Sequence, residues 1–368
     1  MTDDARPHGM LGRMREATRL TRAGRLHDAT ALIQRTLRGV GGADVPGGPG
    51  RTTGAAAPTR VTSTVVRTER TGGAVPLAPP VGSATTSPGR FLTESMTTRA
   101  GTRTYKVFVP GAASATAMPL LVMLHGCTQD ADDFAAGTRM NALAERHGFV
   151  VAYPEQSRQA NPSRCWNWFE PADQSRDRGE PSLIADIART VTATAPIDPS
   201  RVHVAGMSAG GAMAAILGAV HPDLFAAIGV HSGLAHGAAT DLPSALQAMK
   251  QGGAGTARTG PGTPAIVFHG DLDRTVHRGN AEQVLRQATA HVTHPLLTVH
   301  ERAGAGGREA TRYIYRAPDG MTLAEGWSVQ GLGHAWSGGD PEGSHTDPAG
   351  PDASAEMVRF FDEHPHPG

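Results

Sequence analysis

The chain has 368 residues, and its 34 Lys and Arg balance 34 Asp and Glu, so the formal net charge at pH 7 is zero. A chain without excess positive charge has no field that holds a nucleic acid over its whole surface. The longest apolar run, around residues 118–124, is far shorter than the roughly 18 residues of a membrane span. Two cysteines cannot build a disulfide framework, and no Cys/His cluster has zinc-binding spacing.

The first 90 residues differ in composition from the rest. Apolar residues within 10–37 recur at helical spacing on either side of Gly24, which predicts a short helical hairpin in residues 1–40. Residues 41–89 are rich in Gly and Pro, which indicates a flexible linker. A single hairpin cannot bury its apolar stripe alone, so we expect it to dock on the following domain, a second subunit or another surface.

From residue 90 onward, strand-like and helix-like segments take turns, which predicts one α/β domain over 90–368. The expected strands cover residues 91–97, 102–109, 119–125, 149–154, 201–205, 225–231, 264–269 and 327–330, and the expected helices cover 131–147, 182–194, 212–220, 281–292 and 353–363. Such alternation favours a mostly parallel sheet flanked by helices, with the active site at the carboxyl ends of its strands.

An apolar strand runs directly into a small-residue helix through the sequence Val204-Ala205-Gly206-Met207-Ser208-Ala209-Gly210-Gly211. A serine flanked by glycines at a strand-to-helix turn is typical of a nucleophile elbow. The turn holds the serine in a strained conformation, and the glycines avoid collisions with the neighbouring strand and helix. The alternative is that Ser208 only caps the helix.

A serine nucleophile needs a base and a carboxylate that orients the base, and both are expected later in the sequence. The strand over 264–269 ends in Gly270-Asp271-Leu272-Asp273. We select Asp273 as the acid, because Asp271 lies closest to the strand end, where it is suited to brace the loop through backbone amides.

The chain has 17 histidines, and His334 is the candidate base. It lies in the glycine-rich loop Gly331-Leu332-Gly333-His334-Ala335-Trp336-Ser337-Gly338-Gly339, directly after the last expected strand. His231 precedes the candidate acid and is therefore in the wrong order. His269 is expected to face the core.

The oxygen of an attacked carbonyl develops negative charge, which requires two amide donors already in place. One is the backbone N–H of Ala209 at the start of the helix. The other is expected from the loop His125-Gly126-Cys127-Thr128-Gln129, where we select the amide of Cys127. His125 is then a structural residue.

At these motifs the chain resembles the polyhydroxybutyrate (PHB) depolymerase family of esterases, in the α/β-hydrolase superfamily, which is related to feruloyl and acetylxylan esterases. The resemblance extends from about residue 91 to the end. It is carried by Leu124-His125-Gly126-Cys127-Thr128-Gln129, Tyr153-Pro154-Glu155, Cys165-Trp166-Asn167-Trp168, the serine motif, His269-Gly270-Asp271-Leu272-Asp273 and the His334 loop. It implies an α/β-hydrolase fold, a Ser208, Asp273, His334 triad, an oxyanion hole at Cys127 and Ala209, and an acyl-enzyme, without a metal or organic cofactor.

The resemblance also implies a disulfide between Cys127 and Cys165 and a secreted protein. The amino terminus lacks the basic start and apolar stretch of a secretory signal, which by itself predicts a cytoplasmic chain. A reducing cytoplasm disfavours the disulfide. Location and pairing are therefore both open at this point.

Three tryptophans lie near these motifs: Trp166, Trp168 and Trp336. They could line an apolar acyl groove, or they could anchor loops in the core, which is the commoner fate of tryptophan.

We expect a serine esterase that acts on hydroxybutyrate oligomers or related short-chain carboxylic esters. A carbohydrate-type esterase acting on feruloyl or acetylxylan groups is one alternative, and an amide hydrolase with the same triad is another. A third is a non-catalytic protein that binds a polyester granule or a partner through residues 1–40.

Overall fold

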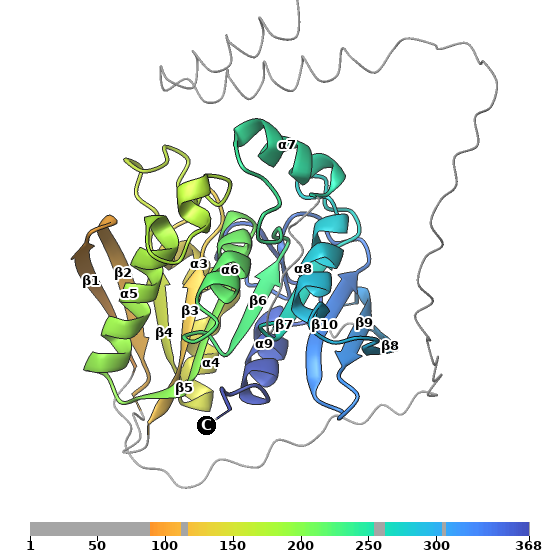
Figure 1. Ribbon diagram of the computed structural model, residues 1–368. Coiled ribbons are helices and arrows are strands. Elements are labelled where there is room, and N and C mark those ends of the chain that lie inside the picture. The colour runs from red at the N-terminus through yellow and green to blue at the C-terminus, as the bar shows by residue number, and fades with distance from the viewer. Residues whose placement is uncertain (1–88, 112–116, 254–261, 304–306, 368) are drawn as a thin grey trace, which may run out of the picture. The chain divides into compact units, whose positions relative to one another are not determined.

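The structure is a computed structural model that describes residues 89–111, 117–253, 262–303 and 307–367. These residues form a ten-stranded sheet with helices on both faces (Figure 1), as the sequence predicts. The hairpin expected in residues 1–40, with its docking partner, and the linker expected over 41–89 lie outside the described residues, apart from Gly89.

The centre of the sheet is parallel and both of its edges are antiparallel. In spatial order its strands are β1 (Arg90–Thr98), β2 (Gly101–Val109), β4 (Val150–Pro154), β3 (Met118–Leu124), β5 (Ile197–Met207), β6 (Ala227–His231), β7 (Ala265–Gly270), β10 (Thr322–Val329), β9 (Glu309–Arg316) and β8 (Leu296–Ala303). All neighbours from β4 to β10 pair in parallel. The carboxyl ends of these strands therefore meet at one edge of the sheet, which is where the candidate residues follow β3, β5, β7 and β10.

Helices cover both faces of the sheet (Figure 1). The helices are α3 (Ala131–Thr138), α4 (Met140–His147), α5 (Gly179–Thr194), α6 (Ala209–Val220), α7 (Leu242–Gln251), α8 (Gly279–Thr289) and α9 (Ala353–Asp362), with a 3-10 turn η1 (Pro171–Gln174). Helices α5, α6 and α8 lie on the near face in Figure 1, and α4 and α9 lie on the far face. None of the helices within the described ranges is both long and apolar enough to cross a bilayer.

The place of β3 in the middle of the sheet explains why residues 118–124 are continuously apolar. Leu120, Val122 and Leu124 belong to the core that includes residues of α5, α6 and α8. Leu121 and Met123 belong to a second core, with residues of α3, α4 and α9. Successive side chains of a strand point to opposite faces, so a central strand covered on both sides is apolar throughout.

Two expectations about the elements need correction. The helix expected over 131–147 is two helices, because Arg139 takes a left-handed conformation (φ 53°) between them, and its guanidinium bonds the carbonyl of Gly338 at 2.7 Å. Helix α7 and strands β8 and β9 were not predicted. Helix α7 buries only Ala245 and Ala248, so its apolar pattern is weak.

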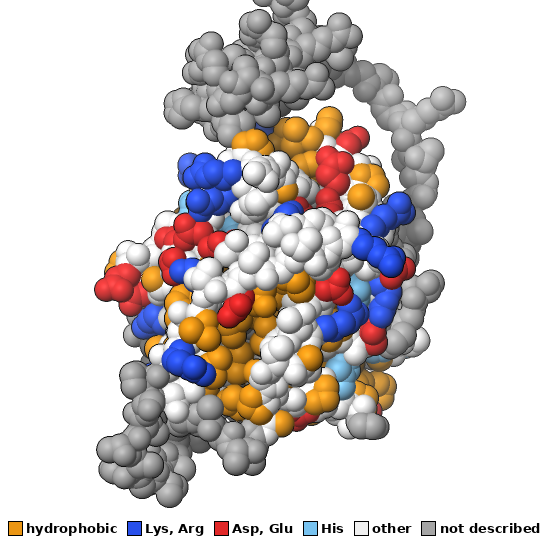
Figure 2. Space-filling model, turned by 90° about the vertical axis from the view of Figure 1, so that its left-hand side faces the viewer, with side chains coloured by type: hydrophobic (Ala, Val, Ile, Leu, Met, Phe, Trp, Pro, Cys, Tyr) orange, Lys and Arg blue, Asp and Glu red, His pale blue; other side chains and the backbone are white. Residues whose placement is uncertain are grey.

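Strand β1 forms one edge of the sheet. Figure 2 views the molecule from this side, and apolar side chains gather near its centre between charged ones. Phe91 and Leu92 on β1 are 36% and 39% exposed. All nine residues of β1 pair with β2. In the strand order, β2 and β4 separate β1 from β3, so this edge is several strands away from the candidate residues.

Candidate active site

Ser208 lies between β5 and α6 in a backbone conformation that side-chain-bearing residues rarely adopt, with φ 55° and ψ −118°. Its amide donates to the carbonyl of His231 at 2.9 Å, and its carbonyl accepts from the amide of Ala212 at 2.9 Å. The residue is half-buried. A strained serine, fixed by backbone bonds on both sides, presents its hydroxyl at the edge of the sheet.

The glycines on either side of Ser208 allow this turn to pack. A methyl group on Gly206 would lie 2.5 Å from the carbonyl carbon of Gly210, and one on Gly210 would lie 2.0 Å from the carbonyl oxygen of Leu124. Both neighbours are backbone atoms, which cannot shift without disturbing the strand or the helix. The glycine spacing therefore follows from close packing of the elbow against the end of β3.

Asp273 and His334 are hydrogen-bonded, with 2.8 Å between the imidazole Nδ1 and the carboxylate Oδ2. The Asp273 side chain is fully buried, and its other oxygen accepts from the amides of Thr275 and Val276, both at 2.9 Å. Burial alone would raise the pKa of the Asp273 carboxyl, but the bond and charge of His334 and the Val276 amide lower it to about 2. The carboxylate is therefore ionised throughout the neutral range.

The neighbouring carboxylate has a different role. Asp271 is exposed, and its Oδ1 accepts from the amide of Gly331 at 2.7 Å. It ties the end of β7 to the loop that carries His334, and it makes no bond to that imidazole.

The rival histidines are buried. His231 is 0% exposed, its Nε2 accepts from the amide of Ser337 at 3.0 Å, and burial with the nearby His269 and His334 lowers its pKa to about 3. His269 lies 4% exposed with its Nε2 2.8 Å from the carbonyl of Val276. Because the backbone of His231 bonds Ser208 and its ring bonds Ser337, this residue holds the elbow beside the His334 loop.

Within the described residues, no hydrogen bond joins the Ser208 hydroxyl to His334, and the imidazole bonds Asp273. Bonds between a nucleophile and its base are often long before substrate binds. The arrangement thus pairs base and acid directly and leaves the imidazole Nε2 available.

Two backbone amides near Ser208 are the candidate oxyanion donors. Ala209 is the first residue of α6, so its N–H has no partner within the helix. A methyl group on Gly126 would lie 3.7 Å from Cβ of Ser208, which puts the loop after β3 next to the nucleophile. The Gly126 amide itself is occupied by the side chain of Gln129 at 2.9 Å. The amide of Cys127 has no acceptor among the described residues.

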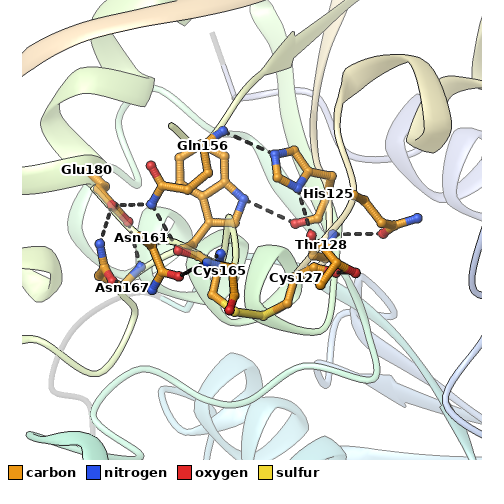
Figure 3. The surroundings of a disulfide bond; sticks show 12 residues. His125, Cys127, Thr128, Gln156, Asn161, Cys165, Asn167 and Glu180 are labelled. Carbon is orange, nitrogen blue, oxygen red and sulfur yellow. Dashed lines mark hydrogen bonds between the residues drawn. A yellow bond between two sulfur atoms is a disulfide. The ribbon is translucent and has the colours of Figure 1, made fainter. Parts of the chain in front are cut away.

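The loop over residues 125–129, termed here the oxyanion loop, is held by the segment 156–167 (Figure 3). Cys127 and Cys165 form a disulfide, 38 residues apart in sequence. The carbonyl of His125 accepts from the indole of Trp166 at 3.1 Å, and the amide of Thr128 donates to Ser163 at 2.7 Å. Contacts from a segment distant in sequence therefore add to the bond between Gly126 and Gln129 that the loop makes internally.

Comparison with known proteins identifies the family of this chain. The model of the family described as esterase PHB depolymerase matches residues 103–311, more than half of the chain. The chain belongs to this family. The match includes the oxyanion loop, Ser208 and Asp273, and it ends before His334.

Proteins similar in sequence to this PHB depolymerase family member include a polyester depolymerase and a feruloyl esterase. Poly(3-hydroxyalkanoate) depolymerase C of Paucimonas lemoignei is 34% identical over 240 residues, which are 61% of this chain and 56% of that protein. Feruloyl esterase B of Neurospora crassa is 32% identical over 241 residues, 60% of this chain and 79% of that protein. The chain thus spans only a little over half the length of the depolymerase it matches.

A solved structure supports the fold. The acetyl xylan esterase from Aspergillus awamori superposes with a TM-score of 0.57 at 20% sequence identity, covering 75% of this chain and all of that one. At that identity the likeness concerns the fold, and the family member described here has the α/β-hydrolase architecture expected from its sequence.

The three tryptophans belong to the core rather than to an open groove. Trp166, Trp168 and Trp336 are 0%, 5% and 1% exposed. The indole of Trp336 donates to Ser354 at 3.0 Å and its ring stacks on His231 at 4.9 Å. Burial of this degree favours the loop-anchoring alternative for all three indoles over the groove alternative.

Sequence reasoning missed the polar residues behind the oxyanion loop. Gln156 follows the Tyr153-Pro154-Glu155 motif, and Glu180 lies in the first turn of α5. The sequence pattern predicts a helix that begins only at residue 182, which leaves Glu180 outside it. A helix beginning at Gly179 would have put it among the buried positions Leu183, Ile184 and Ile187, which is the signal that could have revealed it.

Proposed function

We propose that the protein is a serine esterase that uses Ser208 as nucleophile, His334 as base and Asp273 as the orienting acid. The observation that carries this is the 2.8 Å bond between His334 Nδ1 and the fully buried Asp273 carboxylate. A carboxylate on Nδ1 fixes the tautomer in which Nε2 is the proton acceptor. A strained serine at the same edge supplies the proton.

In the proposed reaction, the Ser208 hydroxyl gives its proton to Nε2 of His334 while its oxygen bonds the ester carbonyl carbon. The carbonyl oxygen becomes an anion that accepts from the amides of Cys127 and Ala209. His334 returns the proton to the departing alkoxide, leaving an acyl group on Ser208. Water, activated by the same imidazole, then releases the carboxylic acid and restores the serine.

We propose hydroxyalkanoate oligomers or related short-chain esters as substrates, because the depolymerase relative is the more similar of the two named above, at 34% identity. Residues 1–40 are proposed, from their apolar spacing alone, to dock on the catalytic domain, a second subunit or a polyester granule.

An ester of a carbohydrate is the second candidate, and one cavity favours it. A cavity of about 240 Å³ beside the oxyanion loop is lined almost wholly by polar side chains, including Asp130, Glu155, Gln156, Arg158 and Arg164. Carboxylates and guanidinium groups together suit a polyhydroxylated alcohol better than an alkyl chain.

The proposal is tested by hydrolysis of 4-nitrophenyl acetate and butyrate by the wild type and Ser208→Ala. We expect the substitution to lower kcat by at least about a thousandfold, because the acyl-enzyme cannot form. Circular dichroism checks that the variant is folded. Equal rates in the two proteins would exclude Ser208 as the nucleophile.

The two substrate classes are separated by kcat/KM across 3-hydroxybutyrate oligomers, methyl ferulate and acetylated xylose. We expect the oligomers to give the highest value. A preference for the acetylated sugar would move the assignment to the carbohydrate class.

A further inference from the structure

Behind the oxyanion loop lies a buried carboxylate that the proposed reaction does not use. Glu180 is 5% exposed, on the far side of segment 156–167 from the disulfide (Figure 3). Charged carboxylates are seldom buried unless several donors meet them. The contacts of Glu180 therefore indicate what this group is held there to do.

In the part of the chain that the structure describes, the hydrogen bonds to the Glu180 side chain all come from donors on segment 156–167. Its Oε1 accepts from the side-chain amide of Gln156 and from Nδ2 of Asn167, the latter at 2.8 Å. Its Oε2 accepts from the backbone amide of Asn167 at 2.7 Å. An ionised carboxylate accepts all three of these bonds, whereas a protonated one has a hydroxyl that must itself donate. The geometry is therefore that of the ionised form.

Gln156 carries the connection onward to the oxyanion loop. Its side-chain amide also donates to the carbonyl of Cys165 at 3.0 Å, and its backbone amide donates to Nε2 of His125 at 3.1 Å. Nδ1 of His125 bonds the carbonyl of Gly126 at 2.7 Å. Gln156 thus reaches the loop at two points: His125 directly, and Cys127 through the disulfide with Cys165.

We propose that Glu180 is a positioning residue for the oxyanion hole: its ionised carboxylate fixes Gln156 and Asn167, and these hold the Cys127 amide where the reaction needs a donor. The inference rests on the proposed esterase function. An amide that is misplaced by a fraction of a hydrogen-bond length loses much of its effect on the transition state and little of its effect on ground-state binding. Glu180 therefore acts on kcat rather than on KM.

The surroundings make this carboxylate titrate near neutrality. Burial raises the pKa of Glu180, with help from the charge of Asp173, to about 7, against the bonds from Gln156 and Asn167 that lower it. The cation facing it is Arg103, whose Nη2 is 3.7 Å from Oε1. As pH falls through about 7, the group gains a proton and one of its accepted bonds is lost. The positioning effect is then present above that pH and absent below it.

The decisive experiment measures kcat/KM of wild type and Glu180→Gln with 4-nitrophenyl butyrate from pH 5.5 to 9. Glutamine keeps the shape of the neutral acid, so the ratio of the two enzymes should be about tenfold at pH 9 and approach one at pH 5.5. Ionisations of the triad occur in both enzymes and cancel in the ratio. A ratio that does not change with pH would overturn the inference.

Two further measurements separate positioning from general structure. The affinity for butylboronic acid, which forms a tetrahedral anion on a serine, should fall by the same factor as kcat at pH 9, while KM stays within about twofold. Glu170→Gln replaces an exposed carboxylate just before the adjacent 3-10 turn, and this variant should match the wild type throughout. A higher KM with unchanged kcat in Glu180→Gln would contradict the assignment. An equal effect of Glu170→Gln would also contradict it.

Gln156→Met provides a second route if Glu180→Gln does not fold. It removes the donor that joins Glu180 to Cys165 and keeps a side chain of similar length. We expect the same loss of kcat, and a pH profile no longer steeper than that of the triad alone. Where both variants fold, combining them should add little to either one, since they interrupt one chain of contacts.

The Ser208→Ala control distinguishes this inference from the proposed function. If wild type hydrolyses the ester, Ser208→Ala does not, and Glu180→Gln is indistinguishable from wild type, only the role of Glu180 is wrong. If Ser208→Ala is as active as wild type, the proposed function fails, and the inference fails with it.

Discussion

The nucleophile elbow and the oxyanion loop adjoin each other, yet they are stabilised in different ways. Ser208 is fixed by its own backbone, with φ 55° and glycines two positions away on each side. The oxyanion loop is fixed from outside, through the Cys127–Cys165 disulfide, the Trp166 indole and the side chain of Gln156. The first arrangement is encoded mainly by the motif around Ser208, with one backbone bond to His231, and the second depends on several partners that are distant in sequence.

The two kinds of stabilisation should respond differently to substitution. A backbone turn packed against Leu124 either forms or clashes, so substitutions in the elbow should abolish the site. A loop held by several separate contacts loses them one at a time, so substitutions around it should weaken the reaction in steps. Substitutions in the triad and substitutions around the oxyanion loop, compared by their effect on kcat, test this expectation.

The largest effect after the nucleophile itself is expected from Asp273→Asn. The amide would donate where the carboxylate accepts, which favours the wrong tautomer of His334 and should lower kcat by roughly ten-thousandfold. KM should change little. Steady-state hydrolysis of 4-nitrophenyl butyrate at pH 8 measures both quantities.

Asp271→Asn is the matched control for that substitution. Its amide oxygen can still accept the Gly331 amide, so we expect activity within a few-fold of wild type. If this control proved the more damaging of the two, the acid would have to be reassigned to Asp271. The pKa of Asp273 is about 2, so wild-type activity should not fall with protonation of this group above pH 4.

Reduction of the disulfide should have an intermediate effect. Dithiothreitol would free Cys127 from Cys165, and kcat should fall by about tenfold as the amide loses its fixed place. Opening a cross-link over 38 residues should also lower the free energy of unfolding by about 4 kcal/mol. Activity and thermal midpoint before and after reduction measure the two effects.

A variant with both Cys127→Ser and Cys165→Ser controls for other actions of the reductant. Its activity should already be low and should not respond to dithiothreitol. Thiol titration of native and denatured wild type should find no free thiol. A free thiol in the active native protein would show that the loop does not depend on the bond.

The smallest effect is expected from Trp166→Phe. The substitution leaves the buried carbonyl of His125 without its donor, which should cost about 1 kcal/mol of stability and lower kcat by a few-fold. Trp168→Phe removes the same atoms from a tryptophan that bonds no part of the oxyanion loop. We expect its kcat to equal that of wild type, and equal losses in both variants would argue against a role for the His125 bond.

The contrast also explains what the sequence could predict. The parallel sheet and the positions of Ser208, Asp273 and His334 relative to its strands follow from local patterns: apolar runs, glycines and the residues at strand ends. Each candidate is encoded within about ten residues. The structure adds the bond between Asp273 and His334, which joins residues 61 positions apart.

The features that were missed depend on longer-range contacts. The break at Arg139 is stabilised by the carbonyl of Gly338, 199 residues away. Composition does not say which face of a loop is covered, so the sequence does not decide the surroundings of the three tryptophans. Glu180 was missed because its partners Gln156 and Asn167 come from a loop whose path no periodic pattern describes.

Gln129 connects the two sides of the site. Its side chain accepts from the amide of Gly126 at 2.9 Å and donates to the carbonyl of Ser344, ten residues past His334, at 3.2 Å. The stretch that presents the imidazole and the stretch that presents the amide are therefore fastened to a common amide group. Anyone who grafts loops from other esterases onto this scaffold will have to transplant both stretches together with residue 129, because exchanging one alone leaves the other without its anchor.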